Sequence, residues 1–268
     1  MRRHYRINKK TFLKRAVWLA FFLLFAVLLF SGYKFVRILK SYYESAESYR
    51  AVADSALTTV SPAPSVSPDA EKAVASSEIP IIVDWDQLKK TNDDVVAWLY
   101  CADTPINYPV VQAKDNEYYL TRGFDHTKSE SGALFLDCRN NIAASDENFI
   151  IYGHRMKDDS MFGTIPQYAE ESYYKKHPTM YLLTPKQNYR VELFACRTVH
   201  SEGKYFETSF ENKEVFRRYL NKAVEQSYWQ ADLSAGTDTP SLTLATCSTY
   251  ANADNPRLLV HGYLVPIA

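Results

Sequence analysis

The chain has 268 residues, 46% of them hydrophobic and 14% aromatic, enough to bury a core in one domain of about 200 residues plus additional segments. Its 31 basic and 31 acidic residues cancel, but the first forty residues contain ten Lys and Arg and no acid, so the remainder is acidic. An acidic body argues against nucleic acid as a partner.

The N-terminal basic residues flank an apolar run. Residues 16–33 (AVWLAFFLLFAVLLFSGY) carry no formal charge and are long enough to cross a bilayer. Seven basic residues precede this run and three follow it, which predicts a cytoplasmic N-terminus and an extracellular body. A cleaved signal peptide is the main alternative, but its small-residue cleavage site is absent, and the flanking charges argue against a buried globular helix. We therefore predict a cytoplasmic tail over residues 1–15 and an uncleaved single-pass anchor over 16–33.

Two segments separate this anchor from the predicted folded domain. Residues 41–57 have helical composition and spacing. Residues 58–78 are rich in Pro, Ser and Ala and too polar to pack, as is typical of a tether. We interpret residues 34–78 as a helical stalk and linker, and we expect the folded domain to occupy residues 79–268.

Short strand-like runs dominate the folded domain. Helical features occur at the start of residues 84–100, with Asp84 as N-cap and with Leu88 and residues 95–99 as apolar contacts. A second helical stretch, residues 211–229, has an apolar stripe formed by Val215, Tyr219, Leu220, Ala223 and Val224. Seven runs are predicted as strands: 106–112, 132–137, 148–153, 179–184, 189–199, 242–247 and 257–265. Many short strands with few helices favour a closed or nearly closed barrel.

Three of the four cysteines have the setting of core residues. Cys101, Cys138 and Cys196 lie in or beside apolar runs, where cysteine usually acts as a small hydrophobic side chain. Two disulfides are the alternative in an exported chain, but a domain of this size does not need them, so we favour free thiols. No CxxC or Cys/His spacing indicates zinc.

The fourth cysteine ends a strand-like run. In residues 242–247 (LTLATC), Cys247 lies on the face opposite the two leucines, and Arg257 opens the next run, RLLVHGYLV. Nine loop-forming residues separate Cys247 from Arg257. Antiparallel pairing of the two runs would place these residues side by side at one end of a sheet.

A nucleophilic thiol needs a group that exchanges protons and a group that stabilises an oxyanion. His154 follows a strand-like run and the breaker Gly153, so its ring can reach into a cleft, although a solvated loop histidine is the simpler interpretation. Arg257 can favour a thiolate or bind an oxyanion, whereas an isolated arginine more often forms a surface salt bridge. Four histidines compete with His154, and the last, on the Arg257 face of its strand, is the strongest: His126, His177, His200 and His261.

These motifs together resemble the class B sortases, the membrane-anchored cysteine transpeptidases of Gram-positive bacteria. The resemblance covers residues 84–265. It rests on TLATC (243–247), which matches the family's TLxTC signature, on IIYGHRMKDDSMF (150–162) and on NPRLLVHGYLV (255–265). INYPVVQAKDNEYYL and GALFLDCRN support it. The predicted helix directly before the cysteine-bearing strand is a further class B feature.

The resemblance implies a mainly β fold, an eight-stranded sortase β-barrel with N-terminal helices and a long helix before the cysteine-bearing strand. It implies that Cys247 attacks the carbonyl of a threonine in a C-terminal sorting motif, NPxTN-like or SPxTG-like, and holds the substrate as a thioester. An amine of the cell-wall precursor or of peptidoglycan then resolves the thioester. His154 would be the general acid and base, and Arg257 would stabilise the substrate and the oxyanion.

The resemblance also implies substrate contacts, partners and the absence of a cofactor. The implied substrate contacts are Asn116, Leu120, Tyr205, Phe206, Ala245 and Ser248. For the aromatic pair, packing within the loop is an equal alternative. The implied partners are surface proteins that carry a sorting signal, a wall amine and the lipid bilayer, and neither cofactor nor metal is implied.

Two other functions remain open from the residues alone. A secreted cysteine peptidase would let water, in place of an amine, resolve the same thioester. A membrane-tethered binding module would use no thiol chemistry, so it would keep its role after Cys247→Ala, whereas either enzyme would lose turnover by orders of magnitude.

Overall fold

The computed structural model describes the backbone of residues 9–59, 79, 81–142, 146–200, 205–231, 239–247 and 256–267. For Cys247 the description covers the backbone alone. The chain forms two compact units, Met1–Glu44 and Ser45–Ala268.

The first element is a long helix, α1 (Lys9–Ala56), which contains the predicted anchor and continues through the predicted helix at residues 41–57. Its large apolar side chains from Leu13 to Leu39 are exposed. Within the described part of the chain, α1 is the one helix long and apolar enough to cross a membrane. An exposed apolar surface of this extent is costly in water and is stabilised in lipid, which makes α1 a candidate membrane anchor.

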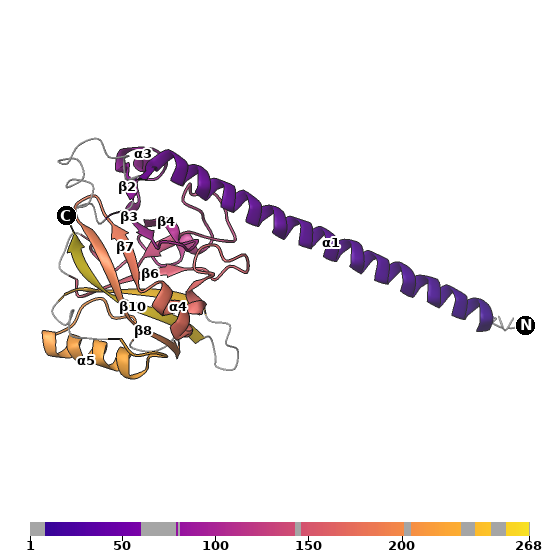
Figure 1. Ribbon diagram of the computed structural model, residues 1–268. Coiled ribbons are helices and arrows are strands. Elements are labelled where there is room, and N and C mark those ends of the chain that lie inside the picture. Colours follow the sequence, from indigo (N-terminus) through magenta and orange to yellow (C-terminus); the bar gives the residue numbers. More distant parts are fainter. Residues whose placement is uncertain are drawn as a thin grey trace, which may run out of the picture. The chain divides into compact units, whose positions relative to one another are not determined.

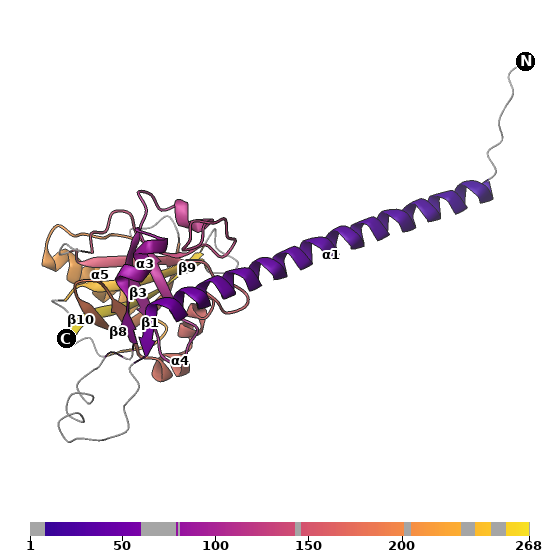
Figure 2. The same ribbon diagram turned by 90° about the horizontal axis from the view of Figure 1, so that it is seen from above.

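The last turns of α1 belong to the second compact unit. Tyr49 and Ala56 are buried, and β1 (Leu57–Thr59) pairs antiparallel with β2 (Ile81–Val83). Figure 2 shows β1 directly after the end of α1. The compact unit therefore begins at Ser45, earlier than the expected boundary at Ile79. Most of the predicted linker, residues 60–78, lies outside the described residues.

A short helix and a strand share the segment after β2. The helix α3 (Trp85–Thr91) is capped as predicted, because the side chain of Asp84 accepts a 2.9 Å hydrogen bond from the backbone N–H of Gln87. The chain is extended again at Asn92 and forms β3 (Val95–Tyr100). The apolar residues 95–99, which we expected to serve the helical segment, thus form a buried strand.

Eight strands close a barrel, as predicted. The seven remaining strands correspond to the seven predicted runs: β4 (Asn107–Val111), β5 (Leu134–Leu136), β6 (Asn148–Gly153), β7 (Thr179–Leu183), β8 (Asn188–His200), β9 (Ser241–Cys247) and β10 (Pro256–Ile267). The order around the barrel is β10-β8-β7-β3-β4-β5-β6-β9. The pairs β4–β5 and β6–β9 are parallel and the others are antiparallel.

Three short helices and one longer helix connect the strands: η1 (Tyr118–Leu120), η2 (Ile165–Ala169), α4 (Glu171–Lys176) and the 13-residue α5 (Lys213–Glu225), the predicted helix before the cysteine-bearing strand. Figure 1 shows α5 on the outside of the barrel beside β8 and β10. Its buried face packs on Phe194 and Tyr263 through four side chains, Phe216, Leu220, Ala223 and Val224. Phe216, which was absent from the predicted stripe, replaces the half-buried Val215 in this face. α5 begins after the cap Asn212 and directly precedes the segment that leads to β9.

Candidate active site

Three neighbouring strands bring the predicted catalytic residues to one end of the barrel. β6 and β9 run parallel, with Gly153 opposite Thr246, so His154 and Cys247 each follow that pair. β9 and β10 run antiparallel, with Cys247 opposite Arg257. The pairing that the sequence predicted for Cys247 and Arg257 is therefore present in the backbone register.

A groove of about 320 Å³ opens at this end of the barrel. The side chains of His154 and Arg257 both line it. Eight further residues complete the lining: Asn116, Leu120, Phe135, Tyr152, Gly153, Phe206, Ala245 and Thr246. Four of the six predicted substrate contacts are in this set, namely Asn116, Leu120, Phe206 and Ala245. The groove thus combines apolar walls with an imidazole and a guanidinium, the mixture of apolar surface and a few polar groups that is typical of ligand sites.

Of the other two predicted substrate contacts, only Tyr205 lies in the described part of the chain, and it is not among the residues that line this groove. The ring of Tyr205 lies over the guanidinium of Arg197, 5.2 Å from it, and the Tyr205 carbonyl accepts a 3.0 Å hydrogen bond from the Tyr219 hydroxyl. Tyr205 thus packs against residues of β8 and α5, whereas Phe206 lines the groove. Ser248 lies outside the described residues.

His154 is oriented by a backbone carbonyl. Its Nε2 lies 2.7 Å from the oxygen of Leu120. Because a carbonyl oxygen can only accept, Nε2 is the nitrogen that carries a proton in this arrangement. Nδ1 is then the ring nitrogen left to exchange protons with a reacting group.

Close packing fixes the chain on both sides of His154. A side chain at Gly153 would collide with Leu134 and Phe162, so the strand end admits no Cβ there. The backbone N–H of Phe162 donates a 3.0 Å hydrogen bond to the His154 carbonyl and closes the following loop. The packing at Gly153 and the hydrogen bond from Phe162 therefore hold the backbone at His154 in place.

A buried carboxylate supports the aromatic wall of the groove. Asp137 is fully buried and accepts hydrogen bonds from Arg139 Nε (2.8 Å), Arg139 Nη2 (2.7 Å) and the Tyr152 hydroxyl (2.9 Å). Arg139 Nη2 also donates to the Phe206 carbonyl at 2.7 Å. Burial raises the pKa of Asp137, but the hydrogen bonds from Arg139 and Tyr152 outweigh burial and hold the pKa below its ordinary value. The Asp137 carboxylate therefore holds Tyr152 directly and Phe206 through Arg139. The rings of Tyr152 and Phe206 both line the groove.

The sequence interpretation did not single out Phe135 and Tyr152. They face each other across β5 and β6, with ring centroids 5.2 Å apart, and the Tyr152 ring is 6.1 Å from that of Phe206. The signal that could have found Tyr152 is alternation, because residues 152 and 154 share one face of an extended chain.

His261, the strongest competitor of His154, is a core residue. It is fully buried, its Nε2 accepts a 3.2 Å hydrogen bond from Arg197, and its Nδ1 lies 3.0 Å from the Thr243 hydroxyl. Burial and the positive charge of Arg197 hold the pKa of His261 well below its ordinary value. A neutral, enclosed imidazole of this kind has no path to the groove. The other three competitors are not among the residues that line the groove: His126, His177 and His200.

Three cysteines are free thiols, as we favoured. Cys101 and Cys196 are buried and Cys138 is half-buried. Burial raises the pKa of both buried thiols, which keeps them protonated and poorly nucleophilic. Neither has the environment of a catalytic cysteine.

Known proteins share this architecture and much of the sequence. The family model of the sortase domain matches residues 99–265. Sortase B of Listeria monocytogenes is 38% identical over 178 residues, covering 66% of this chain and 72% of the relative. A structure of sortase B from Bacillus anthracis in complex with AAEK1 aligns with a TM-score of 0.70 and 30% identity, covering 85% of this chain and 99% of the other. A substrate complex of Staphylococcus aureus sortase B aligns with a TM-score of 0.65 and 28% identity, covering 69% and 85%.

Proposed function

This chain belongs to the sortase family and to its class B members, which are cysteine transpeptidases, and from that premise we propose its reaction in detail. The enzyme cleaves a C-terminal sorting motif, NPxTN-like or SPxTG-like, after its threonine. It then joins the surface protein to an amine of the cell wall. The observation that carries the proposal is the meeting of β6, β9 and β10 at one end of the barrel, with His154 and Arg257 in one groove beside the backbone of Cys247.

Each of the three residues contributes differently to the reaction. The thiolate of Cys247 attacks the threonine carbonyl, and the C–N bond breaks as the leaving amine takes a proton from Nδ1 of His154. The guanidinium of Arg257 donates hydrogen bonds to the oxyanion of the tetrahedral intermediate. The incoming amine then attacks the thioester and returns its proton to His154, which releases Cys247. Protons balance over the cycle.

The groove supplies the substrate contacts. Leu120, Phe206 and Ala245 offer apolar surface to the peptide, and Asn116 offers an amide. The side-chain oxygen of Asn116 accepts a 2.8 Å hydrogen bond from the backbone N–H of Cys138, which orients the remainder of the amide. Tyr205 and Ser248 stay candidate contacts on the resemblance alone. A substrate complex is known for the S. aureus relative, which supports substrate binding by this fold.

The apolar helix supports a reaction at the membrane surface. We infer that α1 anchors the protein with its basic N-terminal tail in the cytoplasm and the barrel outside the cell. A substrate held in the same membrane gains effective concentration from this tether.

A peptide assay tests the proposal against its two alternatives. The full chain in detergent micelles is incubated with a labelled NPxTN-type or SPxTG-type peptide, with and without triglycine as the amine. Amine-dependent ligation supports the transpeptidase, and hydrolysis at the same rate with and without amine supports the peptidase. No turnover, with a peptide affinity that Cys247→Ala leaves unchanged, supports a binding module. Cys247→Ala and His154→Ala abolish ligation if the assignments hold, whereas Cys138→Ala, another accessible thiol, leaves ligation in place.

A further inference from the structure

A tyrosine on α1 contacts the loop that supports His154. Tyr49 is 7% exposed, and its hydroxyl donates a 2.8 Å hydrogen bond to the carbonyl of Gly132. Tyr49 precedes residues 99–265, which the sortase-domain model matches, so the family match does not include it.

Gly132 lies directly against the imidazole. Its φ is +58°, and a Cβ at this position would lie 2.6 Å from the Tyr119 carbonyl oxygen and 3.0 Å from both the Leu120 oxygen and Cδ2 of His154. The next residue, Ala133, donates a backbone hydrogen bond of 3.0 Å to the Tyr119 carbonyl. The backbone at Gly132 therefore packs against both partners of the bond between Leu120 and His154.

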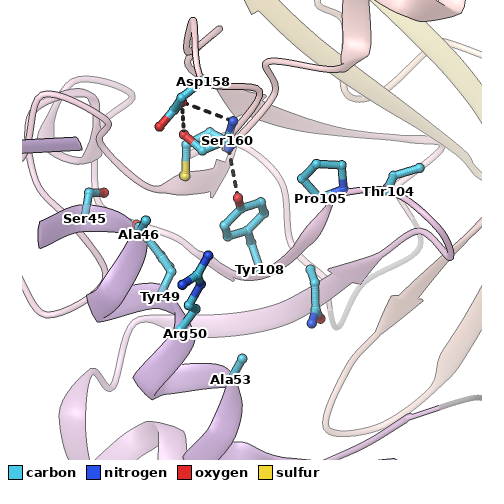
Figure 3. Close-up of a pocket in the computed structure, with 12 residues that line it drawn as sticks. Ser45, Ala46, Tyr49, Arg50, Ala53, Thr104, Pro105, Tyr108, Asp158 and Ser160 are labelled. Atoms are coloured by element: carbon cyan, nitrogen blue, oxygen red, sulfur yellow. Dashed lines mark hydrogen bonds between the residues drawn. The ribbon is translucent and has the colours of Figure 1, made fainter. Parts of the chain in front are cut away.

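A second route leads from Tyr49 to the other side of His154. The Tyr49 ring packs edge-on against Tyr108 with centroids 5.4 Å apart. The Tyr108 hydroxyl accepts a 3.1 Å hydrogen bond from the backbone N–H of Met161, drawn as a dashed line in Figure 3. Phe162, the next residue, donates to the His154 carbonyl. Tyr49 is therefore connected to both segments that hold His154. Its hydroxyl bonds to Gly132, and its ring contacts Tyr108, which bonds to the backbone of Met161.

Figure 3 shows where this side chain lies. Tyr49 and Arg50 come from α1, and Tyr108, Asp158 and Ser160 come from the barrel strand and the loop after His154. These residues line a pocket of about 460 Å³. The end of α1 is therefore built into the wall next to the histidine loop.

We propose that Tyr49 is a positioning residue for His154, an inference that rests on the proposed catalytic role of that histidine. Its hydroxyl fixes Gly132, Gly132 fixes the Leu120 carbonyl, and this carbonyl keeps the proton of the neutral imidazole on Nε2. Nδ1 then remains free to accept the proton of the incoming amine. Without the hydroxyl, the Leu120 carbonyl shifts, and the neutral ring populates the tautomer with its proton on Nδ1, which cannot act as the base.

The test is Tyr49→Phe in the full chain in detergent micelles, which removes one oxygen and keeps the ring contact with Tyr108. We expect kcat of ligation to fall on the order of tenfold with KM changed less than about twofold. In ¹⁵N spectra of the histidine-labelled protein, the resonances of His154, assigned with His154→Ala, move from the Nε2–H tautomer toward a mixture. Tyr43→Phe on the exposed surface of the same helix leaves both readouts unchanged.

Two results overturn the inference. One is Tyr49→Phe with parental kcat and parental His154 resonances. The other is a lower kcat with unchanged resonances and a lower melting temperature, which means that Tyr49 contributes stability alone. A failure of the proposed function is separate, because ligation by His154→Ala at the parental rate removes the catalytic role of the histidine whatever Tyr49→Phe does.

Discussion

The hydroxyl of Tyr152 donates a 2.9 Å hydrogen bond to the carboxylate of Asp137, so an aromatic ring that lines the groove is held by a buried anion. The same carboxylate accepts two hydrogen bonds from the Arg139 guanidinium and one from the Arg139 backbone N–H. A buried charge is tolerated only when its hydrogen bonds are satisfied, and here three side-chain donors meet it. The position of Tyr152 in the wall of the groove therefore depends on the carboxylate of Asp137.

Asp137→Asn removes the charge and keeps the shape. The amide accepts fewer and weaker hydrogen bonds, which we expect to cost about 1–3 kcal/mol of stability. Thermal unfolding of the full chain in detergent then shows a melting temperature lower by roughly 3–9 °C. Asp103→Asn, at an exposed residue with φ of 57°, is the matched control and changes it little. Equal melting temperatures for both variants would contradict the role of the buried anion.

The same carboxylate predicts a pH dependence. Because the pKa of Asp137 is lowered on folding, its charge stabilises the folded state above the ordinary pKa of about 3.8, and this contribution is lost as the pH falls through the lower folded value. The stability difference between the parent and Asp137→Asn is therefore constant from neutral pH to about pH 5 and shrinks below about pH 4. Melting curves of both proteins across this range measure it. A difference that grows toward low pH would have the wrong sign for this mechanism.

Arg139→Lys tests the link between the anion and the loop. A planar guanidinium can bond the Asp137 carboxylate and the Phe206 carbonyl together, and an ammonium cannot reproduce this fork. We expect KM for the sorting peptide to rise about fivefold, the equivalent of one hydrogen bond, with kcat nearly unchanged. Arg190→Lys, in which a comparable guanidinium pairs with Glu192 on β8, is the control. Steady-state kinetics of ligation give both constants, and a fall in kcat at constant KM would point to the chemistry instead.

Local patterns predicted the antiparallel pairing of β9 and β10, because the two runs alternate and a turn-rich stretch separates them. The parallel pairing of β6 with β9 was not predicted from these patterns. Cys247 and Arg257 are opposite each other because β9 and β10, which are consecutive strands in the chain, pair antiparallel. The strand β3 was not predicted, because residues 84–91 do begin a helix and the prediction extended that helical segment to residue 100. The apolar run at residues 95–99 fits the spacing of a helix as well as that of a strand, so periodicity alone does not separate the two. Asn92 adopts the extended conformation that separates the two elements, with φ of −152°.

Contacts between distant segments could not be predicted from these patterns. Tyr205 and Phe206 are adjacent in the sequence, yet one ring meets Arg197 and the other lines the groove. The hydrogen bond from Tyr49 to Gly132 spans 83 positions, and nothing local distinguishes Tyr49 from the exposed Tyr43. Which of two similar side chains becomes buried, and against which partner, depends on tertiary packing between segments far apart in the chain. Local sequence patterns carry no information about that packing.

Arg257 provides the sharpest test of the proposed chemistry. It is opposite Cys247 in the register of β9 and β10 and lines the groove with His154, which supports the proposed role of its guanidinium as an oxyanion donor. Removing one oxyanion donor costs about 100-fold to 1,000-fold in turnover, so we expect this loss in kcat for Arg257→Ala and a smaller loss for Arg257→Lys, which keeps the charge. Single-turnover formation of the acyl-enzyme, followed by mass spectrometry, isolates the step. Arg218→Ala, on the exposed face of α5, controls for loss of a positive charge. Acylation by Arg257→Ala within tenfold of the parental rate would assign oxyanion stabilisation to other donors, such as backbone N–H groups near Cys247.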